Sequence, residues 1–193
     1  MVNDIDLLKK GILLPHYRIL SRILDDSMNR NNRIMDLACK DGNILEMINI
    51  LYNDSQDYTG VDEDEENIFQ ANSKNLNANF KHSKFSKLKM RKNSYDIVIA
   101  QDNYFFNNED VLTRIDNLFR VSRMWVVFFN LLVIPECDTF KIIEMNGESV
   151  KVYGINYLRE VIGLLEPASM EYTYVAKSDN PSEPTTAIFA IKV

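Results

Sequence analysis

The chain has 193 residues, of which 46% are hydrophobic and 26% are charged, the composition of an ordinary globular domain rather than of a disordered or fibrous protein. Its formal net charge of -6 argues against a protein that holds a nucleic-acid backbone through bulk positive charge. Two isolated cysteines and two histidines, with no CxxC pair, predict neither a disulfide framework nor a metal site.

The termini and the surface runs give few further constraints. The opening segment, MVNDIDLLKKGILL, begins with acidic residues and has no long apolar stretch, so we expect no secretory signal and a cytoplasmic location. The longest apolar run, residues 124–135, is interrupted by Asn130 and is too short to span a bilayer. The one dense cationic run, KHSKFSKLKMRK, is predicted to be a solvated surface, with docking of a substrate or RNA as the alternative.

Helical and strand-like patterns alternate along the chain. Residues 1–30 are expected to form a helical cap, in which residues 5–26 are helical in two pieces and Pro15 begins the second piece. The elements predicted after the cap are strand 33–38, helix 43–52, strand 57–62, helix 63–76, strand 79–85, strand 95–101, helix 110–121, strand 125–132, helix 155–165 and strands 170–176 and 185–193. The segment 134–154 shows a less regular pattern.

This alternation predicts a parallel sheet with both faces covered. The last two strands are separated by the turn-rich SDNPSEPT, which favours an antiparallel pair. We therefore predict that residues 31–193 form an α/β fold: a doubly wound, mostly parallel seven-stranded sheet with helices on both faces and a reversed C-terminal strand. A ligand is expected over the carboxyl ends of the first, second and fourth strands, where the strand order changes direction.

The turn after the first strand, DLACKDGN, decides between two cofactor classes. A dinucleotide pattern GxGxxG would place glycines at positions 38, 40 and 43, and none is present. A GxGxG pattern would place them at 38, 40 and 42, and Gly42 is present. Asp36, two positions before the first slot, belongs to the second pattern only. A nicotinamide-dependent oxidoreductase is therefore disfavoured.

With IMDLACKDGN, YTGVDEDEEN, YDIVIAQ and the closing strand pair, the chain resembles the class I S-adenosylmethionine-dependent methyltransferases over residues 30–193. The resemblance implies S-adenosylmethionine as cofactor, with the first loop around its methionine part and Asp62 on the ribose hydroxyls. Residues after the third strand would contact adenine, and Gln101 to Tyr104 would border the reacting methyl. The positions implied to bind the cofactor are Asp36, Ala38, Lys40, Gly42, Asp62, Ser83 and Gln101.

The chain departs from the family pattern at two of these positions. Lys40 occupies a glycine slot, where its side chain either turns outward or swings into the pocket. Ser83 stands near the slot after the third strand, where the family commonly has an acid. For Asp36, a purely structural pairing is the alternative to a site role. For Asp62, the alternative is a solvated acid at a helix N-terminus.

Three residues are candidates for work on the acceptor. His16 is a candidate base, with a capping or surface histidine as the alternative. Asp102 and Tyr104 are candidates for lining an acceptor pocket, although Tyr104 has packing as its alternative. The QDNYFF that follows the fourth strand lacks both prolines of the [DN]PP[YF] element found in amino-methylating nucleic-acid enzymes.

Two functions follow from these residues. The first is methyl transfer to oxygen or nitrogen of a small-molecule acceptor, which Asp36, Gly42 and Asp62 favour. The second is an inactive methyltransferase-like module that binds a ligand or a protein partner, which Lys40 and the missing acid favour. The short segment 134–154 has no nucleic-acid element, so a small acceptor is preferred to nucleic acid, and no membrane partner is expected.

Overall fold

The structure is a computed structural model that describes residues 4–27, 32–52, 56–74, 76–102, 110–145, 147–176 and 180–193. Its helices are α1 (Asp4–Lys9), α2 (Pro15–Ser27), α3 (Asn43–Tyr52), α4 (Glu65–Ser73), α5 (Val111–Val121) and α6 (Ile155–Gly163), with a short 3₁₀ helix η1 (Phe85–Lys87). Its strands are β1 (Arg33–Leu37), β2 (Asp57–Asp62), β3 (Asn79–His82), β4 (Tyr95–Gln101), β5 (Ser122–Ile134), β6 (Phe140–Met145), β7 (Glu148–Gly154), β8 (Ser169–Ala176) and β9 (Thr185–Lys192).

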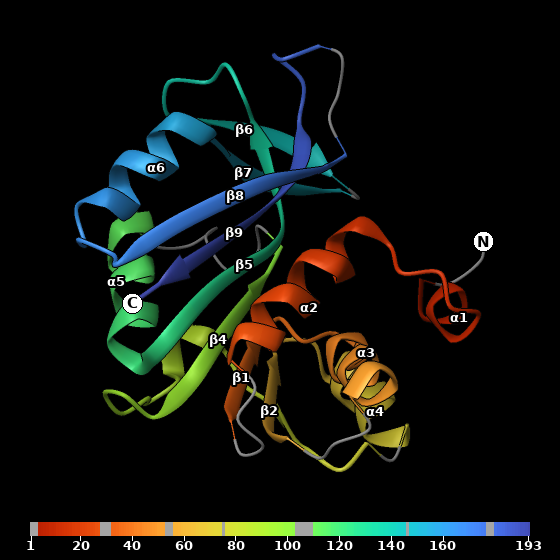
Figure 1. Ribbon diagram of the computed structural model, residues 1–193. Coiled ribbons are helices and arrows are strands. Elements are labelled where there is room, and N and C mark those ends of the chain that lie inside the picture. Colours follow the sequence, from red (N-terminus) through yellow and green to blue (C-terminus); the bar gives the residue numbers. More distant parts are fainter. Residues whose placement is uncertain are drawn as a thin grey trace.

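The central sheet has the predicted topology (Figure 1). Strands β3, β2, β1, β4 and β5 lie side by side in that order and are parallel. Strand β9 pairs antiparallel with β5, and β8 pairs antiparallel with β9. These seven strands form the doubly wound sheet with one reversed strand, so the predicted fold class is confirmed. The strand order reverses at β1 and β4, which puts the expected ligand crevice over their carboxyl ends.

The sheet also contains a hairpin that the prediction lacked. The segment 134–154, expected to be less regular, forms the antiparallel pair β6 and β7. Strand β7 then extends the sheet by pairing with the end of β5 through Val133 and Ile134. With this hairpin, the described residues form a nine-stranded sheet. The alternation of buried Val150 and Val152 around the half-buried Lys151 is the period-two signal of this hairpin.

Two hydrophobic cores lie on opposite faces of the sheet. In β4, Ile97 and Ile99 join a core formed with α1, α2 and α3. Their neighbours Val98 and Ala100 join a core formed with α5 and α6. Figure 1 shows α5 and α6 on one side of the sheet and α2 and α3 on the other. Because alternate side chains of a parallel strand point to opposite faces, such a strand is apolar throughout, as YDIVIAQ is.

The N-terminal helices are packed into this fold rather than separate from it. Ile5 and Leu8 of α1 and Tyr17 and Leu20 of α2 are buried in the same core as α3. Helix α2 therefore lies close to the carboxyl edge of the sheet, where His16 reaches the site described below. No helix in the described ranges is both long enough and apolar enough to cross a membrane.

Candidate functional site

The first loop keeps the backbone path of a glycine-rich loop without the glycines. Ala38, Lys40 and Gly42 have φ angles of 57°, 52° and 80°. These are the three slots of the GxGxG pattern, and all three lie in the left-handed region. Glycine adopts this region freely, whereas a residue with a Cβ is destabilised there by about 1 to 3 kcal/mol. Ala38 and Lys40, the two of these residues that have a Cβ, therefore both bear this strain.

Asp62, at the carboxyl end of β2, ties this loop to the neighbouring strand. Its side chain is buried, and its Oδ2 accepts a hydrogen bond of 2.9 Å from the backbone N–H of Lys40. Its Oδ1 accepts one of 2.9 Å from the N–H of Asp64 and one of 3.2 Å from Nδ2 of Asn67. Hydrogen bonds to an ionised carboxylate are among the stronger ones, so Asp62 fixes the position of the first loop against β2.

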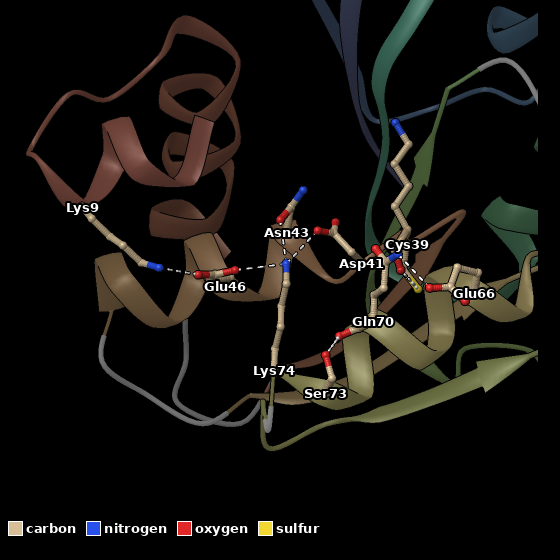
Figure 2. Close-up of polar contacts among 10 residues, drawn as sticks. Lys9, Cys39, Asp41, Asn43, Glu46, Glu66, Gln70, Ser73 and Lys74 are labelled. Carbon is tan, nitrogen blue, oxygen red and sulfur yellow. Dashed lines mark hydrogen bonds and ion pairs between the residues drawn. The ribbon is translucent and has the colours of Figure 1, made fainter. Parts of the chain in front are cut away.

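A network of charges holds the other side of the loop (Figure 2). The ammonium of Lys74, at the end of α4, lies 2.8 Å from Oδ2 of Asp41, 2.9 Å from Oδ1 of Asn43 and 3.2 Å from Oε2 of Glu46. Glu46 also pairs with Lys9 of α1 at 2.7 Å. Burial tends to raise the pKa of Glu46, but the hydrogen bonds from Lys9 and Lys74 outweigh it and hold that pKa below its usual range. The loop and the start of α3 are thus joined to α4 and α1.

The side chain of Lys40 extends toward the end of β4. Its ammonium lies 2.5 Å from Oδ2 of Asp102, the residue after β4. Asp102 has a φ of 56°, and its N–H donates to the carbonyl of Phe129 at 3.1 Å, which fixes it beside β5. The sequence left open whether Lys40 turns outward or inward. Its ammonium pairs across the carboxyl edge between β1 and β4, where the aminoacyl end of a cofactor is expected.

Asp36 is fully buried beneath the loop, and its donors come from the sheet itself. Tyr58 Oη donates to Oδ2, and Nε2 of Gln101 lies 2.8 Å from both carboxylate oxygens. Burial raises the pKa of Asp36 to about 7, although the hydrogen bonds from Tyr58 and Gln101 act to lower it. This is the structural pairing that was the alternative for Asp36. Gln101 takes part in it, so its amide faces into the sheet.

The remaining predicted cofactor residue lies beside Asp62. The N–H of Ser83, after β3, donates to the carbonyl of Asp62 at 2.9 Å, and its hydroxyl donates to the carbonyl of Lys84 at 3.3 Å. Ser83 is therefore at the expected edge of the sheet, with its hydroxyl bonded to its own loop. Tyr104, a candidate for the acceptor pocket, lies outside the described residues.

A cavity of about 380 Å³ opens beyond the end of β4. It brings together His16 and Asp102, two of the sequence candidates, which come from α2 and from the residue after β4. The other lining residues come from β5, from the β6–β7 hairpin and from β8 and β9: Asn130, Leu132, Met145, Val150, Val175 and Thr186. The cavity thus has a mainly apolar wall and a few polar groups, as small-molecule sites usually do. Within the described ranges, no group of three or more His, Cys, Asp or Glu side chains is arranged to hold a metal ion.

His16 is oriented by a residue from the preceding helix. Its Nε2 lies 3.3 Å from Oδ2 of Asp4 in α1, and its ring contacts those of Tyr17 and Phe129. Burial lowers the pKa of His16 below 6.5, and the nearby Asp4 carboxylate only partly opposes this. The imidazole is consequently neutral at neutral pH. With the Nε2 proton donated to Asp4, Nδ1 is the nitrogen that can accept a proton.

Asp4, Tyr58 and Asn130 are among the residues of this site that sequence reasoning missed. Asp4 and Tyr58 gave no usable signal, because their partners are distant in sequence and a lone Asp or Tyr is common. Asn130 did give one: it is the single polar residue within the apolar run WVVFFNLLVI. A polar side chain inside such a strand requires a hydrogen-bond partner or a ligand.

The comparisons with known proteins agree with this geometry. A family model described as a methyltransferase domain matches residues 34–124. Magnesium protoporphyrin IX methyltransferase from Synechocystis PCC 6803, solved with bound S-adenosylhomocysteine, aligns over 100% of this chain and 89% of its own, with a TM-score of 0.63 and 15% identity. The plantazolicin methyltransferase BpumL, in complex with a triazolic desmethylPZN analogue and S-adenosylhomocysteine, aligns over 97% of this chain and 89% of its own, with a TM-score of 0.62 and 16% identity.

The same fold also occurs in a protein of another activity. The cyclase SpnF aligns over 91% of this chain and 80% of its own, with a TM-score of 0.66 and 12% identity. No curated protein sequence matches the chain. The chain has the fold of the class I S-adenosylmethionine-dependent methyltransferases, and the resemblance carried by its motifs is confirmed. Identities this low establish the fold alone, so activity is argued from the site.

Proposed function

We propose that this protein transfers a methyl group from S-adenosylmethionine to oxygen or nitrogen of a small-molecule acceptor. The observation that carries the proposal is the left-handed backbone at all three positions of the first loop, although only one of them is glycine. Two residues bear strain to keep this path, and strain of this kind persists where the surroundings impose it, often at ligand sites.

The residues at the crevice suit the proposed cofactor. Asp62 presents a carboxylate at the end of β2, where it would accept the ribose hydroxyls in exchange for the weaker contact with Asn67. Ala38, Lys40 and Gly42 would border the methionine part, and Ser83 the adenine. S-adenosylmethionine would supply an electrophilic methyl group on its sulfonium. The protein then has to hold the acceptor in line with that methyl and remove a proton from it.

The cavity beside Asp102 is the proposed acceptor site, and His16 is its proposed base. The acceptor oxygen or nitrogen forms its new bond to the methyl carbon as the carbon–sulfur bond breaks. The proton that the acceptor loses passes to Nδ1 of His16, while Asp4 holds the ring through Nε2. The small-molecule methyltransferases among the structural neighbours support an acceptor of this size.

A second function is favoured by a specific contact. The ion pair between Lys40 and Asp102 spans the crevice that the cofactor would occupy. If this pair is not displaced, the crevice is closed and the protein acts as a binding module of the same fold. In this second function the protein catalyses no reaction, so His16 and the cavity have no catalytic role.

The test is transfer of labelled methyl from S-adenosylmethionine to a panel of small hydroxy- and amino-aromatic compounds. The enzyme is expected to release S-adenosylhomocysteine only when an acceptor is present, and His16→Gln is expected to lower that rate. No transfer to any acceptor, together with no binding of S-adenosylmethionine by the unmodified protein, would instead favour the module.

A further inference from the structure

The dense cationic run of the sequence forms an exposed segment between β3 and β4. Residues 81–92 contain six Lys and Arg and no Asp or Glu, so the other 16 of the 22 Lys and Arg residues share the rest of the chain with all 28 acidic residues. The segment is therefore strongly positive on an otherwise acidic protein. All six of its cations are exposed: Lys81, Lys84, Lys87, Lys89, Arg91 and Lys92.

The apolar residues of the segment hold it against the core beside α5. Phe85 is buried, and Leu88 and Met90 are partly buried and pack against the same core as α5. The backbone is fixed as well: Nη1 of Arg120 donates to the carbonyl of Met90 at 3.2 Å. The N–H of Asn93 donates to the carbonyl of Arg120 at 3.0 Å. The cationic side chains thus extend from a backbone whose position is set by α5.

Three of the cations form a row on the outer side of this segment. Exposed and partly buried residues alternate over 87–91, so Lys87, Lys89 and Arg91 point away from the core. Because these positions are two residues apart in an extended chain, they are spaced by about 6 to 7 Å. An extended nucleic-acid strand carries one phosphate charge per nucleotide at a comparable spacing. The row therefore suits a linear polyanion better than a single compact anion.

No carboxylate neutralises the segment within the part of the chain that the structure describes. Lys9, Lys40 and Lys74 each have an acidic partner, but none of the six cations of 81–92 forms an ion pair with a described residue. Glu63 does reach the segment, where its Oε1 accepts from the backbone N–H of Phe85 at 2.6 Å. A surface with uncompensated positive charge attracts and concentrates anionic partners.

The side chains between the cations limit what the partner can be. Proteins that lie on a membrane combine basic residues with exposed apolar ones that enter the lipid. Here Phe85, Leu88 and Met90 face the protein core, so the segment has no such side chains to insert. Phe85 is also the one Phe, Tyr or Trp of the run, and its burial leaves no ring on which a base could stack. Contacts from this segment are therefore contacts to phosphates.

We propose that residues 81–92 bind the phosphate backbone of a single-stranded nucleic acid without reading its bases. The nucleic acid is a docking partner in this proposal and not the methyl acceptor. None of residues 81–92 is among the described lining of the acceptor cavity, so the proposal does not rest on the proposed function. Binding of this kind releases counterions and is weakened by salt.

The first test measures binding of a fluorescently labelled 12-residue oligouridylate by anisotropy at several salt concentrations. Single strands lose affinity with a logarithmic slope of about -0.7 for each phosphate contacted, so six contacts predict a slope of about -4. An oligothymidylate of the same length is expected to bind equally, because the 2′-hydroxyl is not contacted. Absence of binding at low salt, affinity that is independent of salt, or a strong preference for one of the two oligonucleotides would overturn the proposal.

The second test removes the row of cations. The triple variant Lys87→Gln, Lys89→Gln and Arg91→Gln is expected to reduce the salt slope by about 2 and to weaken binding at low salt at least about tenfold. These side chains are exposed and have no partner among the described residues, so the variant is expected to keep the stability of the unmodified protein in urea. Unchanged affinity in this variant would contradict the assignment.

A matched control separates this surface from a general effect of charge. The triple variant Lys10→Gln, Arg18→Gln and Lys141→Gln loses the same charge at exposed positions outside the segment, and it should bind the oligouridylate as the unmodified protein does. An equal loss in both triple variants would show that net charge alone sets the affinity, against the proposal. Sedimentation with phosphatidylserine vesicles without binding of either oligonucleotide would assign the surface to a membrane instead.

Discussion

The ammonium of Lys40 lies 2.5 Å from a carboxylate oxygen of Asp102, so the loop after β1 and the end of β4 are joined by an ion pair. The two residues stand on either side of the crevice at which the strand order reverses. Lys40 is half exposed and Asp102 is one quarter exposed, with side-chain values of 48% and 24%. Ion pairs as exposed as this one contribute little to stability. A ligand can therefore displace the lysine at a small cost in free energy.

Lys40→Gly is predicted to strengthen binding of S-adenosylmethionine by about tenfold. Glycine accepts the φ of 52° without strain, and the carboxylate of Asp102 becomes free to face the cationic sulfonium. S-adenosylhomocysteine has a neutral sulfur, so its binding should be strengthened less by the same substitution. Calorimetry on both ligands checks this, with the exposed Lys89→Gly as control for charge. An equal gain for the two ligands would show that Asp102 does not face the sulfonium.

Asp62→Asn is predicted to weaken binding of S-adenosylhomocysteine by at least about tenfold and to destabilise the protein by about 2 kcal/mol. The amide keeps one acceptor oxygen and loses the charge that holds the N–H groups of Lys40 and Asp64. Asp57→Asn, the same change at the exposed opposite end of β2, is the control. Calorimetry and urea unfolding give the two values. Unchanged ligand affinity in Asp62→Asn would remove this carboxylate from the cofactor site.

His16→Gln is predicted to lower the rate of methyl transfer by about a hundredfold. It is also predicted to remove the fall in that rate at acidic pH. Because the pKa of His16 lies below 6.5, the base is unprotonated at neutral pH, and the rate of the unmodified enzyme should fall only as the pH drops below that value. His82→Gln, at an exposed histidine, should leave the profile intact. An acid limb that persists in His16→Gln would assign the titration to another group.

Asp36 is predicted to make the fold less stable as the pH rises. The pKa of the carboxyl is about 7 in the folded protein and 3.8 when unperturbed, so between these values the folded state binds more protons than the unfolded state. The free energy of unfolding therefore falls through this window and levels off above it. Asp36→Asn removes the titration, and its amide oxygen can still accept a hydrogen bond from Tyr58 or from Nε2 of Gln101.

Urea unfolding at about pH 5 and about pH 8 measures this effect. The unmodified protein should lose a few kcal/mol of unfolding free energy from the lower to the higher pH that Asp36→Asn does not lose, since each pKa unit corresponds to about 1.4 kcal/mol. Asp57→Asn again serves as the control. A difference between variant and unmodified protein that is independent of pH would mean that Asp36 stays ionised throughout.

The sequence predicted the sheet well because its central strands can be recognised from their own apolar residues. YDIVIAQ and WVVFFNLL are apolar on both faces, and Pro15 marked the start of α2. The β6–β7 hairpin was missed because most of its outer strand is solvent-facing: Phe140, Lys141, Ile142 and Glu144 are exposed, which blurs the alternation. Whether a residue belongs to an edge strand depends on pairing with distant segments, which a local pattern does not contain.

The sequence predicted where the candidate residues lie in the fold better than it predicted which residues they contact. GxGxG spacing located the three left-handed residues of the loop, and the strand ends located Asp62 and Asp102. The partners of Asp36 were not accessible, because Tyr58 and Gln101 reach it only through the register of β2 and β4 against β1. The direction of Lys40 likewise depended on Asp102, which lies far along the chain.

Calorimetric titration of the unmodified protein with S-adenosylhomocysteine tests the central claim most directly. One-to-one binding in the micromolar range is predicted, because the loop already has the backbone path that the ligand requires and the ion pair that spans the crevice is weak. Absence of binding in both the unmodified protein and Lys40→Gly would contradict the account, since the first loop would then not be a cofactor site. Binding by Lys40→Gly alone would mean that Lys40 closes a crevice that could otherwise bind the cofactor, as expected if the protein is a binding module.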